Sequence, residues 1–346
     1  MSISHRGKRW LYALVGLLAL GLTACSGDEP QNVLAPVGKY ALKEDRLWDL
    51  TFMFAAVIFV IVEGVLVFTL VKFRHRPGRE AAQFHGNTKL EIILTLIPAT
   101  ILAGIAIPTV KTIFDVAEKP ANALEVTVVG HQFWWEFRYT GLGPDGTDVV
   151  TANELHIPTG QEVYLTLEGK ADDVNHSFWV PRLAGTQDVV PGRENHLLMR
   201  ADTPDTYWGQ CKEYCGLSHA NMRQRVIAET PADFQTWLAE QQKPGVKPTG
   251  GVAAAGQKAF LANACVGCHT IGGTEAAAEV GPNLTHLASR KVFAGALLEL
   301  NKENLIKWVS DAPSVKPGSR MPSGVKDLGL SPQDVQDIVT YLLTLK

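Results

Sequence analysis

The chain has 346 residues, with 32 Lys and Arg against 35 Asp and Glu and a formal net charge of −3. This length exceeds what one ordinary hydrophobic core supports and predicts two or three domains. Nucleic-acid-binding proteins carry a basic surplus, so the charge balance argues against a nucleic-acid partner. Five cysteines, an odd number in three separate regions, argue against a simple disulfide framework.

The N-terminus has the pattern of an export signal. A basic stretch, 5–9, precedes an apolar run, 10–20, that is too short to span a bilayer. Small residues then lead to Cys25, as in a bacterial lipoprotein cleavage box. We therefore expect residues 1–24 to be a lipoprotein-type signal peptide and Cys25 to carry lipid, followed by an exported segment, 25–46. The alternative is an ordinary signal peptide that is cut nearby.

Two long apolar runs come next and predict a transmembrane hairpin, with helices over 47–72 and 91–115. The connecting loop, 73–90, is rich in Lys and Arg, so the positive-inside rule places it in the cytoplasm. Both long flanks then lie outside, in agreement with the export signal.

Two carboxylates accompany these spans. Glu63 lies within the first span, where a charge costs about 2.5–3.5 kcal/mol, so we expect it to face protein rather than lipid. It is either a proton-path residue or a protonated or hydrogen-bonded packing residue. Glu91 lies at the cytoplasmic mouth of the second span, and its position alone indicates a solvated residue.

Residues 120–240 have the pattern of an all-β domain. Alternating apolar residues over 124–129 and 162–167 predict half-buried strands, and Gly/Pro clusters at 141–146 and 191–192 predict turns. A β-sandwich or barrel follows from this pattern.

This domain holds a dense set of soft metal donors. Cys211, Cys215, His219 and Met222 fall within twelve residues, and His176 is a plausible distant ligand from another loop. Thiolate, imidazole and thioether together select copper. Two Cys with two His and one Met suit two coppers bridged by both sulfurs, whereas a mononuclear blue-copper site needs one Cys. A Cys211–Cys215 disulfide is the alternative, but it leaves His219 and Met222 unexplained.

A Pro/Gly-rich linker, 241–252, separates this domain from a helical segment, 253–346. The helical segment contains a Cys-x-x-Cys-His motif at Cys265, Cys268 and His269, which in an exported protein indicates covalent c-type haem attachment. Both cysteines would form thioethers to the haem, and His269 would be the proximal iron ligand.

The helical segment resembles a class I cytochrome c. The resemblance implies that Met321, in the loop Ser319-Arg-Met-Pro, is the sixth iron ligand. It also places Gly256, Phe260 and Tyr341 where the first and last helices cross.

The whole chain resembles subunit II of the haem–copper cytochrome c oxidases, with its binuclear CuA site. The features that carry the resemblance are the two spans, the opening of the second span (91–98), the aromatic segment 130–136 and a cupredoxin domain. The copper ligands that it implies are Cys211 and Cys215 as bridges, His176 and Met222 on one copper, and His219 and the backbone carbonyl of Glu213 on the other.

The resemblance assigns further roles. The side chain of Glu213 helps to hold a magnesium ion at the border with subunit I, and Glu91 lies at the entrance of a proton channel. Electrons from soluble cytochrome c enter at Phe133, with Trp134 and Trp135 nearby. The family commonly has Trp at the position of Phe133, and Phe is a poorer match because it lacks the indole N–H.

We interpret the chain as a caa3-type subunit II with a fused cytochrome c domain, the electron-input subunit of a proton-translocating oxidase. Electrons would pass from a soluble or membrane cytochrome donor to haem c, then CuA, then the haem of subunit I, where oxygen is reduced. The expected partners are subunits I and III in a bacterial cytoplasmic membrane, with both termini and both metal domains outside.

Other functions stay open at this point. One is the CuA-bearing subunit of a related nitric oxide reductase, and another is a membrane-anchored copper or haem electron shuttle. A quinol oxidase subunit is disfavoured, because that branch lacks the copper-binding cysteines. The five thiols are then assigned to lipid, copper and haem, and no disulfide is predicted in the mature chain.

Overall fold

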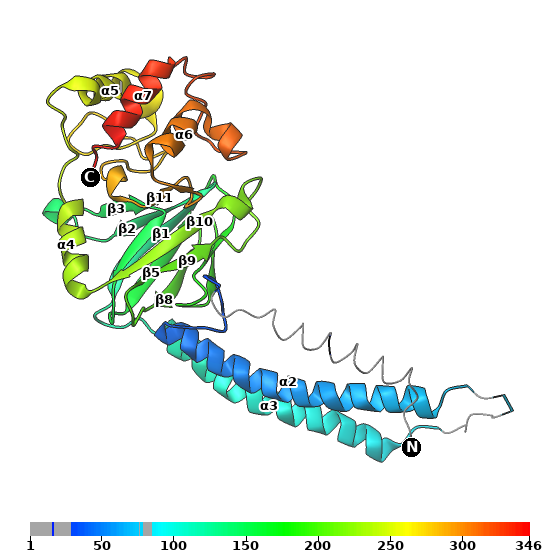
Figure 1. Cartoon of the computed structure of the whole chain (residues 1–346). Coiled ribbons are helices and arrows are strands. Elements are labelled where there is room, and N and C mark those ends of the chain that lie inside the picture. The colour runs from blue at the N-terminus through cyan, green and yellow to red at the C-terminus, as the bar shows by residue number, and fades with distance from the viewer. Residues whose placement is uncertain (1–15, 17–28, 76, 79–84) are drawn as a thin grey trace.

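The computed structural model describes residue 16 and residues 29–75, 77–78 and 85–346. Cys25, and with it the lipidation prediction, lies outside the described residues, as does all but one residue of the predicted signal peptide. The described chain has three parts in sequence order: a helical hairpin, a β-sandwich and a C-terminal helical domain (Figure 1).

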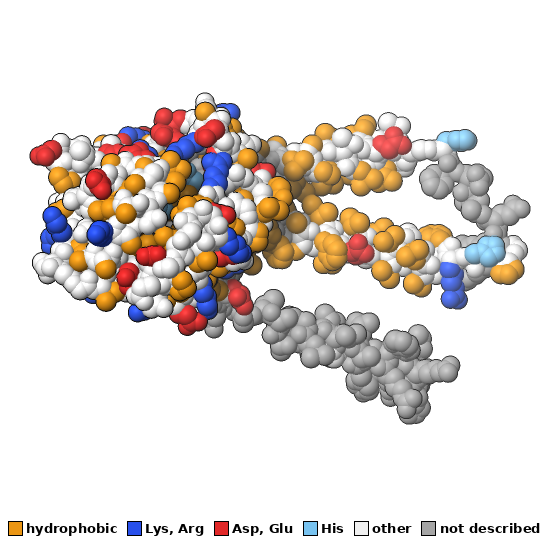
Figure 2. Space-filling view, turned by 90° about the horizontal axis from the view of Figure 1, so that it is seen from above, with side chains coloured by type: hydrophobic (Ala, Val, Ile, Leu, Met, Phe, Trp, Pro, Cys, Tyr) orange, Lys and Arg blue, Asp and Glu red, His pale blue; other side chains and the backbone are white. Residues whose placement is uncertain are grey.

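Two long helices lie side by side and project from the rest of the molecule (Figure 1). α2 spans Lys39–Lys72 and α3 spans Thr88–Ala117, and both are long and apolar enough to cross a membrane. Their apolar side chains are exposed along the hairpin, whereas charged side chains gather on the two other domains (Figure 2). This is the distribution that lipid contact requires.

α2 begins earlier than the predicted start at residue 47. The side chains of Tyr40 and Ala41, in its first turn, are buried, and Tyr40 packs on the core of the sandwich. The N–H groups of Val37 and Gly38 donate to the carbonyl oxygen of Arg182. The hydropathy pattern misses this turn because charged residues separate it from the apolar run.

The predicted β-domain is a sandwich of two sheets with an added hairpin. The larger sheet has the order β3-β2-β1-β5-β8, formed by β1 (Leu124–His131), β2 (Trp134–Tyr139), β3 (Val149–Ala152), β5 (Val163–Gly169) and β8 (Glu194–Met199). The smaller sheet has the order β4-β10-β9, formed by β4 (Glu154–Pro158), β9 (Asp205–Gln210) and β10 (Arg223–Glu229). The hairpin consists of β6 (His176–Trp179) and β7 (Thr186–Val189).

The sandwich ends in a helix that the all-β prediction omits. α4 spans Pro231–Gln241 and starts in a favourable way, with Pro at its first turn and the Thr230 side chain accepting from the Asp233 N–H. Phe234 and Leu238 on this helix pack into the core of the sandwich. The short apolar face of α4 therefore belongs to the β-domain.

The C-terminal domain is helical, as predicted, and its helices are α5 (Gly251–Ala262), α6 (Lys302–Val315) and α7 (Pro332–Leu342). A short hairpin of β11 (Val292–Phe293) and β12 (Leu298–Glu299) is added. α5 and α7 cross at Gly256, where a Cβ would lie 1.9 Å from the carbonyl oxygen of Asp337, so only Gly permits this approach. Phe260 and Tyr341 pack edge to face at the crossing, 6.2 Å apart.

Part of the linker is hydrogen-bonded to the helical domain. The N–H of Gly245 donates to the carbonyl oxygen of Gly272, and His286 Nε2 lies 2.9 Å from the carbonyl oxygen of Lys243. Residues 243–245 are thereby fixed to the helical domain, which sits on the end of the sandwich remote from α2 and α3 (Figure 1).

Candidate metal centres

The soft donors of the sandwich converge on one loop cluster at the end of the smaller sheet. Cys211 and Cys215 follow β9, His219 opens a single 3-10 turn, Met222 precedes β10, and His176 starts β6. The Cys211 N–H donates to the carbonyl oxygen of Met222, so the antiparallel pairing of β9 and β10 closes the loop. The sheet therefore holds donors that are eleven residues apart in sequence at its edge.

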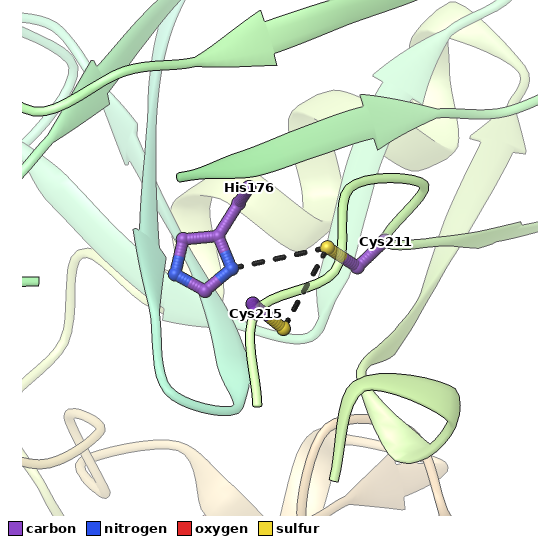
Figure 3. A group of neighbouring side chains, drawn as sticks. All are labelled: His176, Cys211 and Cys215. Carbon is purple, nitrogen blue, oxygen red and sulfur yellow. Dashed lines mark hydrogen bonds between the residues drawn. The ribbon is translucent and has the colours of Figure 1, made fainter. Parts of the chain in front are cut away.

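The distances within this cluster suit a metal centre. The two sulfurs lie 3.9 Å apart, and His176 Nδ1 lies 3.8 Å from Cys211 Sγ (Figure 3). On the other side, Cys215 Sγ lies 3.6 Å from His219 Nδ1 and 3.9 Å from Met222 Sδ. His176, both thiols and Met222 are buried. The structure thus brings together every predicted side-chain copper ligand, and both cysteines are free thiols.

The hydrogen bond between the two thiols favours the loss of one proton from the pair. A hydrogen bond with Cys215 and contacts with His176 lower the pKa of Cys211 to about 4, although burial opposes the shift. The same hydrogen bond and burial raise the pKa of Cys215. The pair therefore holds one shared proton, which a soft cation replaces on binding.

Asp173 orients His176, and no sequence pattern indicates this contact. Its carboxylate lies 3.4 Å from His176 Nε2, which turns Nδ1 toward the sulfurs. Burial lowers the pKa of His176, but the hydrogen bonds with Asp173 and Cys211 outweigh it and the net shift is upward. An isolated Asp in a loop has no motif, so only the fold reveals this contact.

The backbone carbonyl of Glu213 lies within the donor cluster, whereas the residue is exposed at the surface. Its carbonyl oxygen lies 3.2 Å from Cys211 Sγ, within the cluster, while the residue itself is exposed. The exposed neighbours Tyr214 and Leu217 lie on the same loop. The side chain of Glu213 thus lies on the surface of this chain, outside the donor cluster.

The aromatic segment divides between two surroundings. Trp135 is fully buried and lies edge-on to the ring of the copper-ligand candidate His176, 5.9 Å away. Trp134, its neighbour on β2, points the other way and stacks on His131 at 4.1 Å. Phe133 is 5% exposed, and its ring lies between Gly216 of the copper loop and Gly318 of the C-terminal domain. The three residues predicted as one electron-accepting patch therefore do not share an exposed surface.

The C-terminal domain contains a large, mainly apolar cavity. Cys265, Cys268 and His269 line it, and Met321 lines it from the loop between α6 and α7. His269 Nδ1 lies 2.8 Å from the carbonyl oxygen of Pro282, which leaves Nε2 as the free ligand atom. Burial lowers the pKa of His269, which favours the neutral imidazole that binds iron. These residues fit a covalent haem with two axial ligands.

Arg290 is a further cavity residue that sequence reasoning missed. It is buried and lines the cavity, and its Nε has no partner among the described residues, while Nη2 donates to the carbonyl oxygen of Asn283 at 2.6 Å. A buried cation needs an anionic or polar partner. A haem, which carries carboxylates, supplies such a partner.

The two carboxylates of the hairpin lie far along it from both metal sites. Glu91 lies in the first turn of α3, next to the helix cap Asn87, and Glu63 lies within α2. Both are exposed. The described residues do not gather either of them into a cluster with other titratable groups.

A hairpin for a membrane, a soft-donor cluster and a Cys-x-x-Cys-His cavity define a membrane-anchored electron-transfer protein with two metal centres. Three family models match the chain: "Cytochrome C oxidase subunit II, transmembrane domain" over 39–112, "Cytochrome C oxidase subunit II, periplasmic domain" over 124–229, and "Cytochrome c" over 253–346. The chain belongs to the cytochrome c oxidase subunit II family.

Curated relatives agree along nearly the full length. The chain is 37% identical to cytochrome c oxidase subunit 2 of Alkalihalophilus pseudofirmus over 340 residues, which cover 96% of each chain. It is 33% identical to the Bacillus subtilis subunit, with 98% of each chain covered. Among solved structures, the periplasmic domain of subunit II of Bradyrhizobium japonicum cytochrome oxidase matches 36% of this chain and 96% of that chain, at 25% identity and a TM-score of 0.32.

The predicted fold class and family are therefore confirmed. The chain is a subunit of cytochrome c oxidase that transfers electrons through a CuA domain and a fused cytochrome c domain. It is anchored by two transmembrane helices and carries a periplasmic domain. The His/Cys/Cys/Met cluster and the cytochrome c domain imply copper and haem c as cofactors.

Proposed function

We propose that electrons pass from an external cytochrome donor to haem c, then to a binuclear copper centre, and then to the haem of subunit I, where oxygen is reduced. The observation that supports this order is that residues of both domains line the haem cavity. The haem cavity is lined by helical-domain residues and also by sandwich residues, namely His131, Gln132, Phe133, Trp134 and Asn153. One short segment of the sandwich thus separates the two centres.

The ligand set supports two coppers rather than one. Each cysteine sulfur has its own neighbouring donors, His176 and the Glu213 carbonyl beside Cys211, and His219 and Met222 beside Cys215. We infer that Cys211 and Cys215, with these neighbouring donors, would hold two copper ions, and that the copper would supply a one-electron couple. In the haem domain, Cys265 and Cys268 would hold the haem covalently, with His269 and Met321 as axial ligands.

The chain itself keeps both centres rigid. Burial excludes water from Cys211, Cys215 and Met222, and the β9–β10 pairing holds the loop in one conformation. A donor set that is already in place reorganises little when one electron arrives. This property suits a relay that neither makes nor breaks bonds.

Three finer roles follow from the family resemblance. We infer that the exposed Glu213 side chain contributes to a magnesium site shared with subunit I, and that Glu91 lies at the entrance of a proton path. We further infer that the chain lies in a bacterial cytoplasmic membrane with both metal domains outside and with subunits I and III as partners. The exposed Glu213, Tyr214 and Leu217 support a protein contact at this loop.

Metal analysis of the purified oxidase tests the cofactor content. We expect two coppers and one covalent haem for each copy of this chain, in addition to the metals of subunit I. One copper or none would contradict the binuclear centre. Deletion of residues 245–346 tests the electron path: turnover should fall sharply, and unchanged turnover with soluble cytochrome c would contradict delivery through haem c.

A further inference from the structure

Lys316 is a buried lysine at the junction of the two metal domains. It follows the last residue of α6, and only 2% of its surface is exposed. Its Nζ donates to the carbonyl oxygen of Phe133 in the sandwich at 2.5 Å and to that of Ala294 in the helical domain at 2.7 Å. No Asp or Glu among the described residues lies within ion-pair distance of Nζ.

Burying a lysine side chain costs solvation free energy, which hydrogen bonds to well-placed acceptors must offset. Burial lowers the pKa of Lys316 to about 7. The Lys316 amine has no Asp or Glu partner among the described residues, and the carbonyl oxygens of Phe133 and Ala294 take the place of its water. Gly295 makes room for this contact: its φ is +74°, and a Cβ there would lie within 2.5 Å of the Phe133 carbonyl oxygen.

Other contacts cross the same junction. The Arg223 N–H donates to the carbonyl oxygen of Gly295 at 2.9 Å, and Ser218 Oγ donates to that of Pro317 at 2.6 Å. On the far side of the junction, the Glu154 carboxylate accepts from the N–H groups of Lys291 and Val292. These contacts join specific backbone groups, so they define one relative placement of the domains.

The junction covers the segment that the family resemblance gives to an external cytochrome. Besides the Lys316 bond on its backbone, the ring of Phe133 faces Gly318, whose added Cβ would lie 3.2 Å from the ring. With Gly216 of the copper loop against the other edge of the ring, Phe133 is buried between the two domains. A second protein has no access to the Phe133 side chain while the helical domain occupies this place.

We propose that Lys316 is a positioning residue that clamps the haem domain onto residues 131–134, so that the copper centre accepts electrons only through this domain. The inference rests on the proposed order of electron transfer and adds the group that fixes its geometry. In the step that the clamp serves, one electron would leave the haem held by Cys265, Cys268 and His269 and would enter the copper centre held by Cys211 and Cys215. No proton or atom moves, and Lys316 itself neither gains nor loses an electron.

Chemical labelling of the wild-type oxidase gives a first test. An amine-acylating reagent followed by peptide mass spectrometry should modify the exposed Lys302 and Lys307 and leave Lys316 at least about tenfold less modified. Equal labelling of Lys316 and Lys307 would overturn the clamp. This measurement needs no variant and therefore does not depend on the folding of one.

Substitution within the complete oxidase gives the second test. Lys316→Met leaves the carbonyls of Phe133 and Ala294 without their donor, and Lys307→Met on the exposed face of α6 is the matched control. Amide hydrogen exchange over 131–134 and 291–295 should be about tenfold faster in Lys316→Met and unchanged in Lys307→Met. Unchanged exchange in Lys316→Met would contradict the proposal.

Electron-transfer kinetics separate this inference from the proposed function. After rapid mixing with reduced cytochrome, wild-type haem c should be reduced before copper, and haem-to-copper transfer should be about tenfold or more slower in Lys316→Met. The optical and EPR signatures of both centres should stay as in the wild type. Copper reduced before haem in the wild type would contradict the proposed order, whereas correct order with an unaffected Lys316→Met rate would contradict the clamp alone.

Discussion

The side chain of Gln132 links the copper loop to the haem domain. Its Nε2 donates to the carbonyl oxygen of Cys215 at 2.5 Å, and its Oε1 accepts from Arg320 Nη2 at 3.4 Å. Arg320 directly precedes Met321, the expected iron ligand. A continuous chain of covalent and hydrogen bonds therefore joins the two metal centres through one amide.

Replacing this amide tests its part in electron transfer. We expect Gln132→Leu to slow haem-to-copper transfer by about three- to tenfold, because it removes both hydrogen bonds of the link. Copper and haem contents should not change. Gln161→Leu, at an exposed turn, is the control, and flash-induced electron transfer is the measurement. A wild-type rate in Gln132→Leu would show that the link is not used.

The contact between Asp173 and His176 predicts a weaker copper site when the carboxylate is lost. Asp173→Asn keeps the size of the side chain but removes the charge that holds the imidazole, so copper affinity should fall about 10–100-fold. Competition with a copper chelator measures this change. The adjacent exposed Asp172→Asn should behave as the wild type, and equal affinity in both variants would remove the orienting role.

Arg290 predicts an electrostatic effect on the haem. A buried positive charge beside the cavity disfavours the oxidised, more positive iron, so Arg290→Met should lower the haem reduction potential by an amount on the order of tens of millivolts. A spectroelectrochemical titration measures the shift. Lys291→Met, exposed and next in sequence, serves as the control. An unchanged or raised potential in Arg290→Met would contradict this reasoning.

The lowered pKa of Lys316 predicts that domain docking depends on pH. In the docked form the pKa is about 7, against an ordinary value of 10.5, so the docked form binds fewer protons between these values. Docking should therefore strengthen by up to about 1.4 kcal/mol per pH unit as the pH rises from 7 toward 10, and it is weakest below 7. Arg223 and the Cys215 thiol are the charged or titratable groups that act on it.

Hydrogen exchange over 131–134 at several pH values measures this dependence. Protection should increase with pH in the wild type and in Lys307→Met. It should lose most of the dependence in Lys316→Met, which has no titrating amine at this place. A pH-independent wild type would contradict the burial argument.

Local sequence patterns predict much of this structure. Hydropathy predicted both membrane helices, alternation predicted the sandwich, and two dense motifs predicted four of the copper donors and the haem ligands near Cys268. His176 could also be predicted, because the family resemblance includes a histidine ligand at a distant position. In each case the signal lies in adjacent residues or in a fixed period.

The residues that connect the domains carry no such signal. Asp173, Gln132, Arg290 and Lys316 stand alone in the sequence, and their roles depend on contacts with residues far along the chain. The buried state of Lys316 even opposes the ordinary expectation for lysine. The contacts of the linker carry no sequence signal either, because Pro/Gly content says nothing about the surface on which the linker lies.

The fixed linker has a consequence for kinetics. Residues 243–245 are bonded to the helical domain, and that domain is docked on the sandwich. The haem domain, as electron donor, and the copper domain, as acceptor, therefore stay at a fixed distance, and their effective concentration is constant. Transfer between them needs no diffusional encounter, so its rate is first-order and insensitive to ionic strength. Salt then acts only on the outer encounter between the haem domain and its own donor.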